Sequence, residues 1–334
     1  MRLGRLVLAL CLSVTLALVI RCSAAEETQY PDPLQVDADF ALQGEYSGTV
    51  GSPEDRQRLG VQVIALGKGR FEAVGYFGGL PGDGWNREKP LRAQGGLADG
   101  LVQFRSDQGL AILSKDGLVA RDADGNEVGK LEKVVRQSPT LGKKPPAGAV
   151  VLFDGTSDSL KNWEGGRITD AGFLMEGTVS QQKFGDHSIH FEFRLAYQPE
   201  QRGQGRSNSG IYLQGRYEVQ ILDSFGLEGK DNECGGIYSV KAPDVNMCYP
   251  PLSWQTYDID FKAARYDQQG KLAANPRMTV RHNGVIVHNG IELPGDRSTT
   301  AAPVGPGPES GPVFLQNHGC PLRYRNVWVV EQGK

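Results

Sequence analysis

The stretch "SNSGIYLQGRYEVQILDSFG", residues 207–226, threads polar side chains through two short apolar runs. Successive side chains of a β-strand point to opposite faces of a sheet. Val219 and Ile221 are therefore predicted to face a core, and Glu218 and Gln220 to face away from it. The stretch predicts two strands of a sheet that has one apolar face and one polar face.

The same alternation recurs on both sides of this stretch. Residues 188–197, "SIHFEFRLAY", and residues 255–262, "QTYDIDFK", alternate in the same way. Residues 277–290 hold an Asn-Gly pair between two apolar runs, which is a strong signal for a two-residue hairpin. No amphipathic run of helical period is long enough to indicate a helix. Residues 150–332 are therefore predicted to form an all-β, two-sheet sandwich rather than one small barrel.

The chain before this sandwich divides into two further parts. Residues 38–136 contain short β-branched and aromatic runs separated by "GKG", "PGDG" and "DADGN", residue types that form turns. We predict a small antiparallel β domain there. Residues 137–149, "QSPTLGKKPPAGA", are rich in Pro, Gly and Lys and have no periodicity, which indicates a linker.

The first 25 residues have the pattern of a secretory signal peptide. A positive start precedes an apolar run over residues 6–20, and "SAA" at residues 23–25 resembles a cleavage site. The run is short of the roughly 20 residues that span a bilayer, so we expect a secreted or periplasmic protein without a transmembrane segment. A retained N-terminal anchor is one alternative. Lipoprotein processing at Cys22 is another, although Arg21 before it is not a small residue.

Charge and cysteine content narrow the class of protein. The formal net charge is −3 and no long basic run exists, so a nucleic-acid partner is not expected. The 44 glycines and 19 prolines favour a turn-rich β fold. Beyond the signal peptide the chain keeps Cys234, Cys248 and Cys320, of which Cys234 and Cys248 are the candidate disulfide because they are close in sequence. No Cys/His cluster suggests a structural zinc.

Alternation also groups the polar residues that could carry chemistry. Gln316 and His318 share one face of their strand, and Glu192 and Arg194 share one face of theirs. If these faces belong to one sheet, they converge into a surface of acids, amides and arginines that suits sugar hydroxyls. The candidate ligand-binding residues are Asn208, Tyr212, Gln220, Gln316, Arg194, Arg323, Arg325 and Glu192. A solvated outer face is the alternative for each.

Histidines divide into three groups. His318 is flanked by Asn317 and Gly319, which leaves room for a ligand, and histidine titrates near neutral pH as an acid or base requires. His282 and His288 lie beside Asn-Gly turns and are predicted to be surface loop residues. The remaining histidines at positions 187 and 190 have no clear assignment.

A glycosidase pattern lies partly in the opening stretch. Retaining glycosidases of the laminarinase and lichenase type carry E-x-D-x-x-E on a bulged strand, and this chain has Glu218, Gln220 and Asp223 at the same spacing. Retaining hydrolysis needs two carboxyl groups about 5–5.5 Å apart. Gln220 replaces the central acid, so the pattern weakens this interpretation without excluding it.

Three segments resemble one known family. "VLFDGTSDSLKNW", the opening stretch and "GPVFLQNHGCPLRYRNVWV" occur in the order found in the 3-keto-disaccharide hydrolase family. The resemblance runs from about Val150 to Val330 and leaves the N-terminal β domain unmatched. It implies a concanavalin-like jelly-roll sandwich, an exported bacterial protein, and activity on glycosides oxidised to a ketone at carbon 3.

Such a ketone makes the chemistry possible with one carboxylate. It acidifies the hydrogen on carbon 2; a base removes that hydrogen, an enolate forms, and the group on carbon 1 leaves before water adds. We expect Glu218 or His318 as the base and the other as the acid. Arginines would stabilise the enolate oxygen, and the amides would hold hydroxyls. A divalent cation is the alternative electrophile, with Glu218, His318 and Glu192 as its expected ligands.

Two other classes of function stay open. A jelly-roll sandwich can bind carbohydrate without reacting, and it can serve only as a scaffold in a wall-associated protein. Loss of Glu218 or His318 separates these classes, because a binding module would retain some affinity and an enzyme would lose turnover. The sequence leaves the glycoside, the oligomeric state and the role of the N-terminal domain undetermined.

Overall fold

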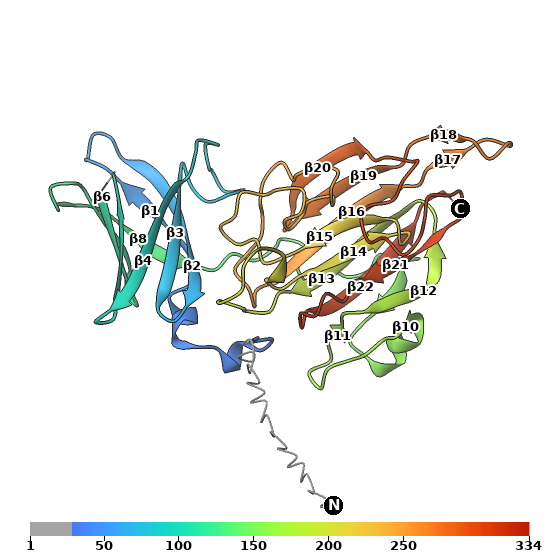
Figure 1. Cartoon of the computed structure of the whole chain (residues 1–334), viewed down its shortest axis with the longest axis horizontal. Helices are drawn as coiled ribbons and strands as arrows, with labels where there is room; N and C mark the ends of the chain where they lie inside the picture. The colour runs from blue at the N-terminus through green and yellow to red at the C-terminus, as the bar shows by residue number, and fades with distance from the viewer. Residues whose placement is uncertain (1–28, 108, 334) are drawn as a thin grey trace, which may run out of the picture.

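The protein is represented by a computed structural model that describes residues 29–107 and 109–333. These residues form two β units that lie side by side (Figure 1). The prediction of an all-β fold is confirmed. The predicted signal peptide falls outside the described residues. Within the described ranges, no helix is both long and apolar enough to cross a membrane.

The first unit is a closed antiparallel barrel (Figure 1). Its strands are β1 (Gly44–Val50), β2 (Gln57–Gly67), β3 (Arg70–Phe77), β4 (Leu91–Ala98), β5 (Leu101–Ser106), β6 (Gly109–Ser114), β7 (Gly117–Arg121) and β8 (Glu127–Val134). Each strand pairs with the next, and β1 also pairs with β8, so the sheet has no free edge. Closure was not foreseen, because the pairing of β1 with β8 joins segments far apart in the sequence.

One end of the barrel is plugged. Two short 3₁₀ helices, η1 (Pro33–Gln35) and η2 (Ala38–Ala41), precede β1. Asp39 of η2 accepts a hydrogen bond from the Gly69 backbone N–H at 2.8 Å, at the tip of the β2–β3 hairpin. Lys133 Nζ donates to the Ala41 carbonyl at 2.6 Å. Leu42 then joins the apolar core of the barrel, so this end is filled by side chains.

The second unit is a sandwich of two main sheets. The five-stranded sheet has the order β10 (Trp163–Glu164), β12 (Thr178–Phe184), β21 (Gly311–Leu315), β14 (Ser209–Leu213) and β15 (Tyr217–Ile221). The seven-stranded sheet has the order β11 (Leu174–Met175), β22 (Arg323–Glu331), β13 (His187–Arg194), β16 (Trp254–Lys262), β19 (Arg277–His282) and β20 (Val285–Glu292), with β9 (Val150–Phe153) beside β22. The remaining elements are η3 (Ser157–Asn162), η4 (Gly203–Gly205), β17 (Arg265–Tyr266) and β18 (Leu272–Ala274). The two-sheet sandwich is the predicted arrangement.

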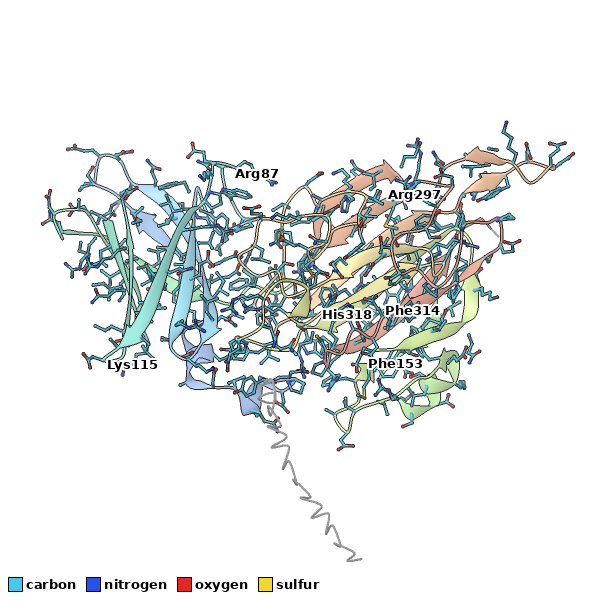
Figure 2. All side chains as sticks on the ribbon, viewed as in Figure 1. Arg87, Lys115, Phe153, Arg297, Phe314 and His318 are labelled. Carbon is cyan, nitrogen blue, oxygen red and sulfur yellow. The ribbon has the colours of Figure 1, made fainter. Side chains whose placement is uncertain are left out.

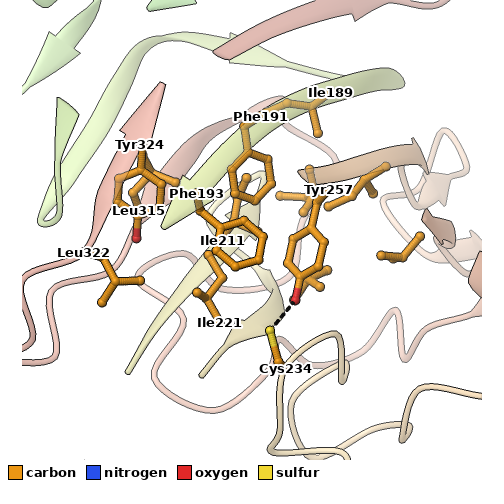
Figure 3. Close-up of a cluster of buried hydrophobic side chains, with 14 of the residues drawn as sticks. Ile189, Phe191, Phe193, Ile211, Ile221, Cys234, Tyr257, Leu315, Leu322 and Tyr324 are labelled. Atoms are coloured by element: carbon orange, nitrogen blue, oxygen red, sulfur yellow. Dashed lines mark hydrogen bonds between the residues drawn. The ribbon is translucent and has the colours of Figure 1, made fainter. Parts of the chain in front are cut away.

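The core of the sandwich is an apolar layer between its sheets (Figure 3). Phe191 and Phe193 of β13 meet Ile211 of β14 and Tyr257 of β16 there. The Phe193 and Tyr257 rings lie 4.8 Å apart, centroid to centroid. Because side chains alternate along each strand, the residues between these core positions point to the outer faces.

The barrel packs against the sandwich through both apolar and ionic contacts. Ile64 and Val74, on the outside of the barrel, belong to the same buried cluster as Phe225 of the sandwich. Arg136 binds the buried carboxylate of Glu45, and its guanidinium lies 4.9 Å from the centre of the sandwich's Tyr249 ring. The barrel and the sandwich are therefore in direct, buried contact.

The predicted linker is held against the sandwich. The Gly142 backbone N–H donates to Glu192 Oε1 at 2.5 Å. The Thr140 hydroxyl donates to Asp258 Oδ2 at 2.7 Å, and Asn326 donates to the Lys143 carbonyl at 2.9 Å. Residues 138–143 consequently cover part of the outer face of the seven-stranded sheet.

The expected disulfide is not formed. Cys234 and Cys248 are buried free thiols, as is Cys320. The Cys234 sulfur lies 3.2 Å from the Tyr257 hydroxyl, and the Cys248 sulfur points to the Leu222 carbonyl at 3.6 Å. Both thiols are thus hydrogen-bonded within the core, and the prediction from sequence proximity was wrong.

Replacing Phe191 with alanine tests the core. The side chain is fully buried between Phe193 and Tyr257, so Phe191→Ala is expected to lower the free energy of unfolding by about 3–5 kcal/mol. Urea denaturation followed by tryptophan fluorescence measures the change. Leu34→Ala is the control, because that side chain is 91% exposed and should change stability by no more than about 0.5 kcal/mol. Equal effects of the two would contradict this assignment of the core.

Candidate functional site

The outer face of the five-stranded sheet carries the best candidate site. In the β14–β15 hairpin, Tyr212 lies opposite Glu218 and Gly210 lies opposite Gln220. Tyr212 also lies opposite Phe314 of β21 on its other side. Since the neighbouring residues Ile211 and Val219 fill the core, these side chains point away from it.

Glu218 is the centre of this group. The Tyr212 hydroxyl donates to Glu218 Oε2 at 2.8 Å. Gln316 Nε2 donates to the same hydroxyl at 3.1 Å, so an amide, a phenol and a carboxylate form a chain of hydrogen bonds. Glu218 is only 2% exposed, because the segment that contains Thr299 and Thr300 covers it.

A glycine makes room for this carboxylate. Gly210 stands in the middle of β14, and a Cβ atom there would collide with Glu218 Oε1. The backbone of β14 therefore lets the Glu218 side chain lie flat across it. An isolated glycine within a strand signals such a close approach, so "NSGIY" could have indicated this contact from the sequence alone.

Burial changes the acidity of Glu218. Removal from water disfavours the charged form and raises the pKa of Glu218 to about 7, while the Tyr212 hydroxyl offsets part of this shift. The carboxyl group therefore exchanges its proton near neutral pH. This is the range in which a general acid or base works best.

Amide side chains lie beside the carboxylate. Asn208 Nδ2 donates to the Gln204 carbonyl at 2.8 Å, and Gln220 Nε2 donates to Gln204 Oε1 at 3.2 Å. Asn208 Oδ1 is buried and accepts no hydrogen bond from any described residue. The group thus has an acceptor that a ligand hydroxyl could satisfy. Gln204, in η4, was missed because nothing in its local sequence marks it.

His318 lies on the loop that follows β21, two residues after Gln316 (Figure 2). It is exposed, and it forms no hydrogen bond or ion pair with any part of the chain that the structure describes. The neighbouring Asn317 stabilises the loop, because its Oδ1 accepts a hydrogen bond from the Gly319 N–H at 2.8 Å. His318 therefore has a free imidazole near the sheet that carries Glu218, without a direct contact between the two.

Four predicted ligand-binding residues lie elsewhere, and the expectation of one converging surface was wrong. Glu192 and Arg194 are on β13, and Arg323 and Arg325 are on β22, both strands of the seven-stranded sheet. The residues next to them along each strand face the core, so these four side chains point to the outer face of that sheet. The two outer faces of a sandwich point in opposite directions.

The residues of that second face bind one another. Arg325 Nε lies 2.6 Å from Glu192 Oε2, and its guanidinium lies 4.0 Å from the centre of the Trp254 ring. Burial alone would raise the pKa of Glu192, but the His190 ring 3.7 Å away and hydrogen bonds from Asn326 and Arg325 outweigh it and bring the pKa to about 2. Arg323 Nη1 lies 3.5 Å from Glu176 Oε2. These contacts indicate a structural network.

The surface positions predicted for two histidines were wrong. His282 and His288 are fully buried, where His288 Nε2 lies 2.8 Å from the Gly235 carbonyl oxygen. Burial lowers the pKa of His282 to about 3 and that of His288 to about 4, so both are neutral at physiological pH. The segment around Gly235 folds over the β19–β20 hairpin, which the local Asn-Gly signal could not reveal. His187 and His190 are buried as well.

The partial glycosidase pattern does not supply a second free carboxylate. Asp223 is buried, and its Oδ2 lies 2.6 Å from Arg206 Nε. Its charge is therefore neutralised by a side chain of the protein. Glu218 and Asp223 have different environments, and retaining hydrolysis by this pair is disfavoured.

The expected cation ligands do not come together. Glu192 lies on the other sheet from Glu218 and His318. Among residues 29–107 and 109–333, no group of three His, Cys, Asp or Glu side chains is placed to hold a metal ion. The ligand set suggested from the sequence was wrong.

The fold is that of an all-β sandwich, and comparisons with known proteins identify its family. The 3-keto-alpha-glucoside-1,2-lyase-like domain matches residues 148–330, more than half of the chain, which therefore belongs to this family. The resemblance noted in the sequence is confirmed. No protein with a curated description matches the chain.

Solved structures are similar to a little more than half of the chain. The crystal structure of a predicted glycosyl hydrolase from Parabacteroides distasonis ATCC 8503 is 31% identical with a TM-score of 0.50, over 56% of this chain and 85% of that one. A second such protein from that organism is 18% identical with a TM-score of 0.38, over 55% and 98%. A third is 17% identical with a TM-score of 0.40, over 60% and 99%. Membership places the chain among carbohydrate-active hydrolases and lyases.

The raised pKa of Glu218 predicts a pH-dependent stability. An unfolded chain binds the glutamate proton with a pKa near 4.3, so the folded protein holds this proton more tightly. The free energy of unfolding should then fall as the pH rises from about 4.3 through about 7. Glu218→Gln, which keeps an acceptor for Tyr212 without a charge, is expected to be more stable than the native protein by about 3–4 kcal/mol at pH 8 and nearly equal at pH 4. Urea denaturation at both pH values measures this, and a pH-independent difference would contradict it.

Proposed function

We propose that the protein is a carbohydrate-active enzyme that cleaves glycosides carrying a ketone at carbon 3, by proton abstraction, elimination and hydration. The observation that carries the proposal is the buried Glu218 carboxyl group, with a pKa of about 7, on a polar sheet face of a chain from this family. One carboxylate is sufficient for this route, whereas a retaining glycosidase needs two.

The reaction can be written with named atoms. Glu218 as base takes the proton from carbon 2, and the electrons of that bond form an enolate with the carbon 3 oxygen. The bond from carbon 1 to the glycosidic oxygen then breaks, and the leaving oxygen receives a proton from an acid. Water adds across the carbon 1–carbon 2 double bond, with oxygen on carbon 1 and hydrogen on carbon 2, so the net change is hydrolysis.

Neighbouring residues have supporting roles in this proposal. The Tyr212 hydroxyl holds the carboxylate through its 2.8 Å hydrogen bond, which makes Tyr212 a positioning residue. Asn208, Gln220 and Gln316 bind substrate hydroxyls. His318, exposed and unpaired among the described residues, supplies the proton to the leaving oxygen. Because Glu218 is covered, the segment around Thr299 has to move for substrate to enter.

We also propose that the protein is exported. The apolar run and small-residue site in residues 1–25 support secretion or a periplasmic location. Cleavage at this site would be visible as a shortened N-terminus in the mass of the mature protein.

Glu218→Gln tests the base. A positioned base contributes about 10²–10⁴-fold to rate, so turnover of a 3-keto-glucoside should fall by that factor while the native protein leaves the unoxidised glucoside intact. Glu228→Gln is the matched control, since that exposed carboxylate contacts only Lys230 among the described residues. Binding without turnover by the native protein would favour a carbohydrate-binding module. Hydrolysis of an unoxidised β-glucan would favour a glycosidase instead.

Tyr212→Phe tests the positioning role. With Glu218 as the base, the rising limb of the kcat/KM profile should lie near pH 7, because only the carboxylate accepts a proton; loss of the proton from the acid produces the separate falling limb. The Tyr212 hydroxyl lowers the pKa of Glu218, so its removal should move this rise to higher pH. The pH profile of kcat/KM measures the shift. A profile that falls in size without moving would indicate a structural role for Tyr212 only.

A further inference from the structure

The end of the barrel opposite η2 is hollow. A cavity of about 440 Å³ opens there, at the end where β1, β3, β5 and β7 finish. In Figure 2, Arg87 marks this end and Lys115 marks the plugged end. Every residue that lines the cavity lies between Val50 and Val128. The cavity is therefore part of the barrel alone and is separate from the site on the sandwich.

Small residues at inward positions create the space. An eight-stranded barrel has an interior just wide enough to be filled by side chains or to hold one small ligand. At the plugged end the interior holds large buried residues such as Tyr46, Phe71 and Leu113. At the open end, the cavity is lined by Ala73, Gly75, Ala93, Ala111 and Ala120. Small residues thus take the place of large inward-facing residues only at the open end of the barrel.

Backbone geometry does not require the glycine among them. A Cβ atom at Gly75 would meet only ordinary contacts, the nearest being Leu91 Cβ at 3.5 Å. Gly75 is also absent from the residues with positive φ. Alanine would fit at this position, so neither a close backbone contact nor a turn explains the absence of a side chain there.

The walls and the rim define the chemistry of a ligand. The walls are apolar and include Leu59, Phe77, Leu91 and Phe104. An apolar cavity of about 150 Å³ holds a benzene molecule, so a volume of about 440 Å³ has room for roughly 15–18 non-hydrogen atoms.

The charges at the rim of the cavity restrict the polar end that a bound ligand can carry. Asp55, Glu88 and Asp122 stand there. The two arginines of the lining are already bound to the protein: Arg92 to Glu72 at 2.9 Å, and Arg121 to the Gly125 carbonyl at 2.8 Å. An anionic ligand would therefore meet three carboxylates against a single lining arginine, Arg121, that is not paired with a carboxylate among the described residues and is already held by a backbone carbonyl.

We propose that the barrel binds a small apolar molecule, an alkyl chain or a ring system, whose polar end is neutral or positively charged. The barrel then carries a binding function of its own beside the sandwich. This inference does not depend on the proposed reaction of Glu218.

Fluorescence titration of the full chain tests the binding. The uncharged dye N-phenyl-1-naphthylamine is expected to bind saturably at one site per chain, with enhanced emission. Decan-1-ol and decylamine should displace it at lower concentrations than decanoate. Ala111→Phe and Ala120→Leu fill the cavity and should weaken dye binding by at least about tenfold. Ala98→Phe is the matched control, because Ala98 is exposed on the barrel surface.

Each outcome bears on the proposal. Circular dichroism identifies a filled variant that does not fold, and the other filled variant then decides. Unchanged dye affinity in a folded, filled variant would overturn the proposal, as would an equal loss in Ala98→Phe or no saturable binding by the native protein. Displacement by decanoate at the same concentration as decylamine would overturn the assignment of the polar end.

Discussion

The contact between the two apolar sheet faces of the sandwich determines where every polar strand residue can lie. Phe191 and Phe193 of one sheet pack with Ile211 of the other, and all three are removed from water. A strand that fills this layer with every second residue must present the others to an outer face. Glu218 and Glu192 are therefore both buried carboxylates, but on opposite sides of the molecule. Their different acidities follow from this separation: Glu218 has a phenol as its main partner, whereas Glu192 has an arginine and a histidine.

Local pattern and long-range pairing contributed different parts of this arrangement. Alternation within β15 predicted that Glu218 and Gln220 share a face, because that depends only on neighbouring residues. Whether two strands share a sheet depends on partners far away: β14 pairs with β21, about a hundred residues later, and β13 lies between β16 and β22. The sequence offered no measure of that choice, so the arginines were placed with Glu218 by mistake. Cover from other segments was equally invisible, as the buried His282 and His288 illustrate.

The barrel illustrates the same division. Its turns were marked by glycine, aspartate and asparagine, and its strands by β-branched and aromatic residues, so the β character was predictable. Its closure and its hollow end were not, because both depend on which residues face inward. Once β1 pairs with β8, the small residues of β3, β4, β6 and β7 meet at one end. These scattered alanines give no signal in the sequence, and they form a cavity only when the closed barrel brings their strands together.

The segment between the two units changes what counts as the sandwich. The family match begins at residue 148, yet Thr140 and Gly142 bind the carboxylates of Asp258 and Glu192. A fragment cut at the family boundary would leave these acids, both with pKa values below their ordinary range, without partners that the intact chain provides. The part of the chain whose buried acids all keep their hydrogen-bond partners is thus longer than the part that the family match covers.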